Sequence, residues 1–207
     1  MANIINKAIK TNSLIRIGHN QYLKASEAEN KLVYEGHYSL LSHEIISLIP
    51  TLFPLLQWQI WELSWLNEFI NHLITRNTIF VEVEHEGCDF VFSALNERYP
   101  GKVLLNPTAK ELSLYGENKT IVVRRLISEA PTHKKFKHQA PLEKLIVDLF
   151  SNQGLLISKG DYPSAIEEMF SKYRIDTTAM MRYARRRNKA NLLSKYIKNE
   201  TNIELKT

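Results

Sequence analysis

The 207-residue chain has a single cysteine, Cys88, and only seven glycines. One thiol excludes an internal disulfide framework and suits a reducing compartment such as the cytoplasm. The few glycines form no G-x-G-x-x-G, Walker or G-x-S-x-G arrangement, which excludes the common nucleotide-binding loops and the hydrolase nucleophile elbow. No neighbouring group in the sequence would activate Cys88, so we expect it to pack as a small apolar residue.

The chain also lacks a long apolar run. A bilayer span needs about 20 mostly apolar residues, and the most apolar region, 45–66, is interrupted by Pro50, Pro54 and several polar side chains. The first residues carry lysines but no apolar core followed by small residues, so we expect no signal peptide. The sequence therefore predicts a cytoplasmic protein that does not interact with the membrane.

The charge excess is small. The chain has 27 Lys and Arg against 22 Asp and Glu, a formal charge of +5. Such a balance permits nucleic acid as a partner without requiring it. With 44% hydrophobic residues, the chain has enough apolar side chains for a core.

Apolar periodicity predicts a mixture of strands and helices. The runs 79–84, 102–105 and 120–127 are typical of strands and predict a sheet, with a crossover helix over 88–99. We expect another helix over 39–49, ended by Pro50 and Pro54. From Pro141 onward the pattern is helical, and Asp176 or Thr177 is a plausible N-cap. Asn188 is expected to end the third of these helices in a left-handed conformation.

Three aromatic residues, Trp61, Trp65 and Phe69, are spaced four residues apart, as on one face of a helix. Such a stripe could stack on nucleic-acid bases. Because no Lys or Arg is interleaved with it, core packing or a domain interface is the favoured interpretation.

Basic residues gather in three places that could contact phosphate groups or an acidic protein surface. Arg182, Arg185, Arg186 and Lys189 recur at three- and four-residue steps, which predicts one helix face. The other two places are a loop at 132–138 and a hairpin at 14–23, which contribute Lys134, Lys135 and Lys137, and Arg16 and His19, respectively. A solvated helix face is the alternative interpretation of the arginines, and an ordinary edge hairpin that packs on the following residues is the alternative for 14–23. For the loop, a solvated and mobile connection is the favoured interpretation.

The strongest enzymatic candidates are Glu82 and Glu84, with Asp148 as a third acid. Carboxylates two residues apart on a strand point to one face and can hold a divalent cation in nucleases and nucleotidyltransferases. No lysine follows at short range, and the seven histidines form no helical zinc motif. The leading expectation is a protein that is not an enzyme and has no cofactor.

Several blocks in order carry a resemblance to a known family. They include the hairpin LIRIGHNQYL, the strand IFVEVE, and the segments PLEKLIVDLF and YRIDTTAMMRYARRRN. The chain resembles AbiEi-like proteins, the antitoxin and transcriptional-regulator half of bacterial abortive-infection (type IV toxin–antitoxin) systems. The resemblance implies a DNA-binding winged helix followed by an α/β domain. It also implies two partners, operator DNA and a nucleotidyltransferase toxin.

The family's winged helix normally has at least two helices before its wing, whereas here about a dozen residues precede the hairpin. We therefore expect a winged-helix remnant over 1–26, consisting of a short helix and the hairpin. An α/β domain with C-terminal helices would follow over 27–207. The predicted fold class is α/β, a small mixed sheet with a helical C-terminal section, preceded by a truncated winged-helix-like hairpin.

Overall fold

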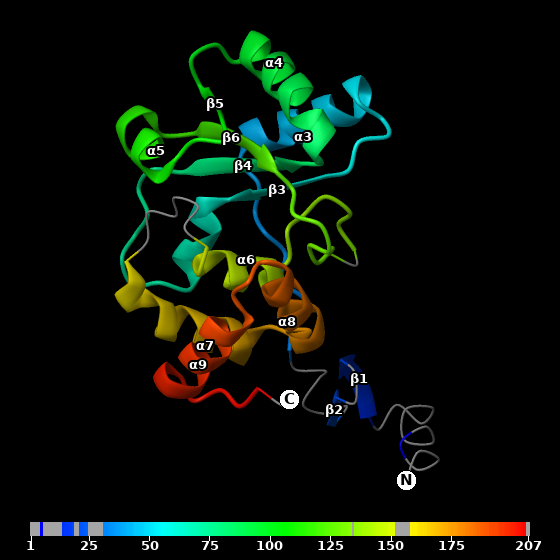
Figure 1. The fold of residues 1–207 in the computed structure, drawn as a ribbon, viewed down its shortest axis with the longest axis vertical. Coiled ribbons are helices and arrows are strands. Elements are labelled where there is room, and N and C mark those ends of the chain that lie inside the picture. Colours follow the sequence, from blue (N-terminus) through cyan, green and yellow to red (C-terminus); the bar gives the residue numbers. More distant parts are fainter. Residues whose placement is uncertain are drawn as a thin grey trace.

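The computed structural model describes residue 5 and residues 14–18, 21–24, 31–133, 135–151 and 158–205. The fold is mixed α/β, as the sequence predicts (Figure 1). Four strands form the main sheet: β3 (Trp58–Glu62), β4 (Thr78–Val83), β5 (Val103–Leu105) and β6 (Thr120–Arg125). The sheet confirms all three predicted strands and adds β3.

The strand order is β3-β4-β6-β5, with β3 antiparallel to β4 and the other neighbours parallel. Its centre is apolar and rich in β-branched residues, as in the run Ile121–Val123, because strands buried on both faces have no solvated side. Segment 138–140 runs along the outer edge of β3, where Ile60 donates its N–H to the carbonyl of His138 at 2.8 Å and accepts from Ala140 at 3.3 Å.

One face of the sheet is covered by α3 (Leu40–Leu52) and α4 (Cys88–Arg98). Ser39 caps α3. We had expected the helix to end before Pro50, but it continues for two residues beyond it. Proline removes one backbone N–H donor from a helix. In the last turn the other backbone hydrogen bonds still form, such as the one from the Phe53 N–H to the Ile49 carbonyl. Cys88 is buried on this side, as expected.

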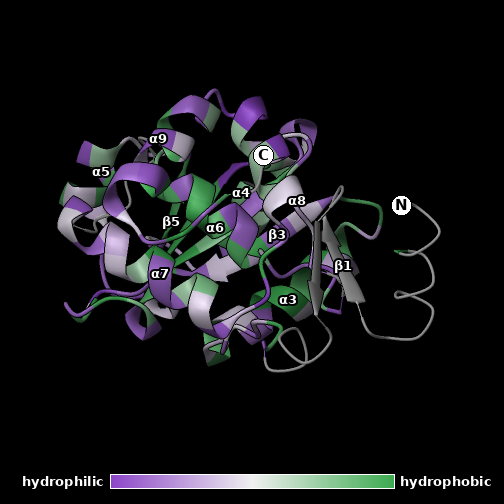
Figure 2. Cartoon of the chain, turned by 90° about the horizontal axis from the view of Figure 1, so that it is seen from below, coloured by the Kyte–Doolittle hydropathy of each residue, from purple (hydrophilic) through white to green (hydrophobic). Residues whose placement is uncertain are grey.

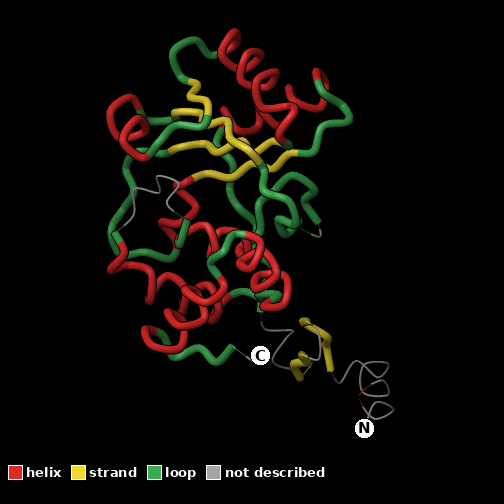
Figure 3. Tube along the Cα trace, in the orientation of Figure 1, coloured by secondary structure: helices red, strands yellow, loops and turns green. Residues whose placement is uncertain are grey.

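The other face meets the C-terminal helices, which gather below the sheet in Figure 3. They are α6 (Leu142–Leu149), α7 (Tyr162–Lys172), α8 (Thr177–Arg186) and α9 (Ala190–Glu200), with α5 (Ala109–Tyr115) beside the sheet. Figure 2 shows the hydrophobic residues concentrated on the strands and on the inner sides of the helices. The helical C-terminal section is therefore confirmed.

The helix predicted from Trp61, Trp65 and Phe69 is wrong. Trp61 belongs to strand β3, and Trp65 to the short 3-10 helix η1 (Leu63–Glu68), with Phe69 as its last cap. All three side chains are nonetheless buried in the core between the sheet and the C-terminal helices. The aromatic residues are thus core residues, as favoured, and no stacking platform for bases is exposed here.

The N-terminal hairpin is present as β1 (Leu14–Gly18) and β2 (Gln21–Lys24). The helix expected around 3–10 lies outside the described residues, apart from Ile5, and so does His19 at the hairpin tip. Strand β1 lies close to α8. Among the helices that the structure describes, none has the length and apolar character needed to traverse a bilayer.

Candidate functional site

A cluster of charged side chains is buried between the sheet and the C-terminal helices. Glu82 projects from β4 toward the helices and is 1% exposed. Its Oε1 accepts hydrogen bonds from Arg124 of β6 at 2.6 Å and from Lys144 of α6 at 2.8 Å. The indole N–H of Trp61 donates to the same oxygen at 2.9 Å. One carboxylate therefore joins three strands of the sheet, β3, β4 and β6, to the first C-terminal helix.

Asp148 continues the cluster toward α8. Lys144 lies one helical turn before it and contacts its Oδ2 at 2.5 Å. From α8, Tyr183 donates its hydroxyl to Asp148 Oδ1 at 3.1 Å, and Arg187 lies 3.5 Å from the same oxygen. The Tyr183 hydroxyl also accepts from Arg187 at 3.3 Å. Asp148 thereby fixes the position of α8 relative to α6.

The protonation states follow from these contacts. Burial alone would raise the pKa of Glu82, but Arg124 and Lys144 outweigh it and hold that pKa far below its usual range. Burial lowers the pKa of Arg124, and the attraction of Glu82 and Asp148 reverses this, so that the guanidinium stays charged. Burial, together with Asp148, raises the pKa of Tyr183, which stays neutral.

The structure brings two of the three predicted metal-binding acids together, because both Glu82 and Asp148 contact Lys144. Glu84 follows the last residue of β4 and accepts from the Gln57 N–H at 3.0 Å, away from the other two. A divalent cation between Glu82 and Asp148 would have to displace buried cationic side chains that already neutralise them. No cluster suited to a metal occurs among the described residues. The geometry therefore does not favour the nuclease alternative.

Sequence reasoning missed the cationic half of this cluster. A lysine partner for Glu82 was expected close to it in the sequence, whereas the actual partner, Lys144, comes from a helix 62 residues away. A signal was available, since Lys144 and Asp148 stand four residues apart in the segment Leu142–Phe150, whose other residues apart from Glu143 are apolar. Charged residues on the buried side of an apolar helix indicate a satisfied internal pair.

The outer side of α8 is strongly basic. Arg182, Arg185 and Arg186 are all exposed, and none forms an ion pair with any residue that the structure describes. Asp176 caps the start of α8 by accepting from the Ala179 N–H. Asn188 ends the helix with a φ of 55°, as predicted.

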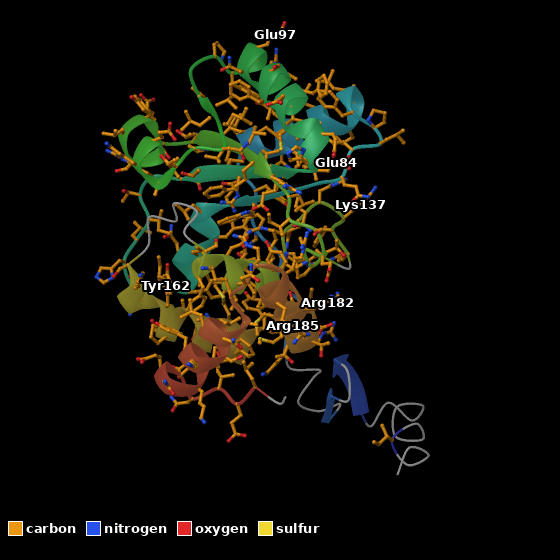
Figure 4. The ribbon with its side chains drawn as sticks, viewed as in Figure 1. Glu84, Glu97, Lys137, Tyr162, Arg182 and Arg185 are labelled. Atoms are coloured by element: carbon orange, nitrogen blue, oxygen red, sulfur yellow. The ribbon has the colours of Figure 1, made fainter. Side chains whose placement is uncertain are left out.

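Lys189 corrects the predicted stripe. Helix α8 ends at Arg186, so Lys189 lies in the following turn, where its N–H bonds to Ala184 and its side chain is half-buried. The exposed helical face therefore consists of Arg182, Arg185 and Arg186, which we call the α8 basic face. Figure 4 shows Arg182 and Arg185 on the same side of the molecule as Lys137.

Residues 132–133 and 135–138 of the predicted basic loop are anchored to the rest of the fold by two histidines. His133 is buried, bonds to the carbonyl of Tyr34 at 3.0 Å, and accepts from the Lys135 and Phe136 N–H groups. His138 stacks on Trp58 with ring centroids 4.1 Å apart. Both histidines therefore hold the loop in place.

The predicted lysines of this loop differ from one another. Lys135 pairs with Glu35 at 2.7 Å across exposed surface, and Lys137 is exposed without a partner among the described residues. Lys134 lies outside the described part of the chain. In the hairpin, Arg16 stands on β1, next to α8, but the direction of its side chain is not described.

Two of the three predicted basic regions meet at a pocket of about 370 Å³. Lys135 of the loop and Arg182 of α8 both line it, together with Arg174, which sequence reasoning missed. Glu143 and Asp176 line it as well, so its charge is mixed. The carboxylate of Glu143 accepts from the Asp176 N–H at 2.7 Å.

Comparison with known proteins places the chain in a family. The model of a family of unknown function (DUF6577) matches residues 1–203. The chain belongs to this family. No curated protein and no solved structure matches it. The match covers the hairpin, the sheet and the C-terminal helices, so the charged cluster and the α8 basic face both lie within the family's extent.

Proposed function

We propose that this member of the DUF6577 family is a regulator that binds nucleic acid, with the α8 basic face as its main contact. The observation that carries the proposal is the exposure of Arg182, Arg185 and Arg186 without acidic partners among the described residues. Guanidinium groups in this state can form bidentate bonds to phosphate oxygens without first breaking an internal ion pair.

The buried cluster supports the proposal because it holds α8 in place. Tyr183 and Arg187 face inward to Asp148, while the three arginines of the α8 basic face point outward from the same helix. A helix anchored in this way presents its charges at fixed positions, which lowers the ordering cost of binding. In this proposal the exposed Lys137 and Arg16, which stands on the strand β1 close to α8, extend the contact.

The resemblance to AbiEi-like proteins makes the proposal more specific. Within it, the bound nucleic acid would be the operator upstream of the protein's own gene, and the chain would also counter a nucleotidyltransferase toxin as an antitoxin in phage defence. Both roles use exposed basic surface and need no catalytic residue. An acidic surface on such a toxin would be the second partner of the α8 basic face.

The test is fluorescence anisotropy with the DNA upstream of the gene and with random duplex DNA over a salt series. Each phosphate contact contributes about 0.9 to the slope of log affinity against log salt. We expect the triple variant R182A/R185A/R186A to bind more weakly and with a shallower slope. A variant with the same charge change at the far end of the molecule, R98A/K102A/K110A, should bind like the wild type.

Four outcomes are informative. Tighter binding to the upstream DNA than to random DNA supports an operator-binding regulator. Equal affinity for both supports nucleic-acid binding without an operator. Equal binding by the triple variant and its control contradicts the role of α8, and a stable complex with a neighbouring toxin that the triple variant loses would assign the face to a protein partner instead.

A further inference from the structure

A second pocket, of about 380 Å³, lies where α8 ends beside the segment that follows β6. Three arginines line it, Arg125, Arg186 and Arg187, together with Ser128, Asn188 and Ile127, and no acidic residue is among its described lining. Arg186 donates its Nε–H to Ser128 Oγ at 2.5 Å, a bond between two exposed side chains that keeps this guanidinium beside the pocket.

The topology places this pocket where α/β proteins commonly bind ligands. Strands β4 and β6 are parallel neighbours, so their carboxyl ends meet at one edge of the sheet. The chain leaves β4 for α4 on one face and leaves β6 for α6 on the other. Such a switch in direction opens a crevice at the carboxyl ends of the strands. Arg125, the last residue of β6, stands at this point.

The buried cluster contributes one positive charge, that of Arg187, to the lining of the pocket. Among the described residues it contains two carboxylates, Glu82 and Asp148, and three cationic groups, those of Arg124, Lys144 and Arg187. Arg124 and Lys144 already balance the two acids, so the charge of Arg187 is in excess. Its side chain is only 9% exposed. A charge that is withdrawn from water and incompletely compensated is costly, and an anion next to it would offset that cost.

We propose that this pocket is a binding site for a phosphoryl group, held by Arg125, Arg186 and Arg187. Three guanidinium groups, one of them shared with Asp148, match a phosphomonoester, which carries a charge of about −1.5 to −2 at pH 7. A phosphodiester of a nucleic-acid backbone carries one negative charge and needs fewer partners. The Ser128 hydroxyl and the Asn188 side chain line the same pocket and add polar groups for the phosphoryl oxygens.

The site is distinct from the α8 basic face and does not depend on nucleic-acid binding. Arg186 belongs to both, but Arg125 belongs only to the pocket and Arg185 only to the face. Both residues are exposed, and neither forms a hydrogen bond or ion pair with the buried cluster among the described residues. The variants Arg125→Gln and Arg185→Gln are therefore a matched pair that separates the two sites.

The experiment is isothermal titration of the full chain with inorganic phosphate and pyrophosphate, with chloride at equal ionic strength as the control. We expect saturable binding by the wild type and by Arg185→Gln, and an affinity at least about tenfold lower for Arg125→Gln, since a charge-assisted hydrogen bond is lost. The absence of saturable binding in the wild type, or an equal loss in both variants, would overturn the site.

Two sources could supply the phosphoryl group, a phosphorylated nucleic-acid end or a free phosphorylated molecule. Short oligonucleotides with a 5′-phosphate or a 5′-hydroxyl distinguish them. If the protein prefers the 5′-phosphate oligonucleotide and Arg125→Gln abolishes this preference, the pocket is supported and its ligand is a nucleic-acid end. If the protein binds inorganic phosphate but shows no such preference, the pocket is supported and its ligand is a free phosphorylated molecule. If the wild type binds DNA but shows no saturable binding of phosphate, the proposal for the pocket is wrong and the proposed function is unaffected.

Discussion

Arg186 and Arg187 are neighbours in the sequence and have opposite surroundings. Arg186 is exposed on the outer side of α8, whereas the side chain of Arg187 is 9% exposed and lies against Asp148. The two sides of α8 thus use the same residue type in different ways. On the inner side the charges are desolvated and paired, so they determine the position of the helix. On the outer side the charges are exposed and form no ion pair with the described residues, so they remain available to a partner.

The comparison implies that inner-side substitutions change stability and outer-side substitutions change binding. A buried ion pair adds little stability compared with apolar residues, because desolvation offsets the attraction between the charges. Breaking such a pair is far more costly, since one charge is then left buried and alone. Variants that leave one buried charge without its partner should therefore show the largest difference in stability between inner-side and outer-side substitutions.

Lys144→Ala should have the largest effect. It leaves Glu82 and Asp148 with one cation fewer, and removing one partner of a buried pair costs about 3–5 kcal/mol of unfolding free energy. Urea denaturation followed by circular dichroism measures this loss, with the exposed Lys195→Ala as control. Lys144→Met keeps most of the apolar volume of the side chain and removes its charge, so it should lose nearly as much stability as Lys144→Ala. A much smaller loss in Lys144→Met than in Lys144→Ala would contradict the explanation by charge.

Acid should destabilise the protein through Glu82. The folded-state pKa of Glu82 is depressed by Arg124 and Lys144, despite the opposing effect of burial. Its stabilising contribution is therefore complete above the unfolded-state value of about 4.3 and is lost as the pH falls below it toward the folded-state pKa. Urea midpoints measured from pH 6 down to pH 3 should fall more steeply for the wild type than for Glu82→Gln. Parallel curves would show that other carboxylates dominate.

Tyr183→Phe should have an intermediate effect. The hydroxyl donates to Asp148 and accepts from Arg187, so its loss leaves a buried carboxylate oxygen short of a donor. Such a loss costs about 1–3 kcal/mol. The exposed Tyr115→Phe is the matched control in the same denaturation experiment. If both variants melt like the wild type, the link from Asp148 to α8 contributes little to stability.

The α8 basic face should show the smallest change in stability. Exposed substitutions usually alter the unfolding free energy within about 0.5 kcal/mol each, so R182A/R185A/R186A should keep a melting temperature close to that of the wild type. Calorimetry of the purified variant checks this before any binding measurement. A large loss would mean that these arginines stabilise the packing of the C-terminal helices, and weaker DNA binding could not then be attributed to charge.

The sequence predicted most of the elements, but not the contacts between them. The β-branched run at Ile121–Val123 and the apolar faces of the C-terminal helices identified their elements correctly. Strand β3 was missed because Trp58 and Trp61 pack into the cores on opposite sides of the sheet. A strand buried on both faces shows no alternation, and the tryptophan spacing then imitates a helix. The charged cluster was half predicted, because its acids were singled out while its cations come from distant segments.

The segment that pairs with Ile60 bears on how this molecule can associate with others. An uncovered outer strand offers a row of free N–H and C=O groups to any extended chain, including another copy of itself. Here the 138–140 segment occupies part of the β3 edge, and the opposite edge strand, β5, has only three residues. The sheet therefore gives little room for strand addition, the mode by which many domains capture extended peptides. A partner of the main sheet would therefore meet mainly side chains, and the short or partly covered edges of this sheet offer little template for amyloid-like self-association.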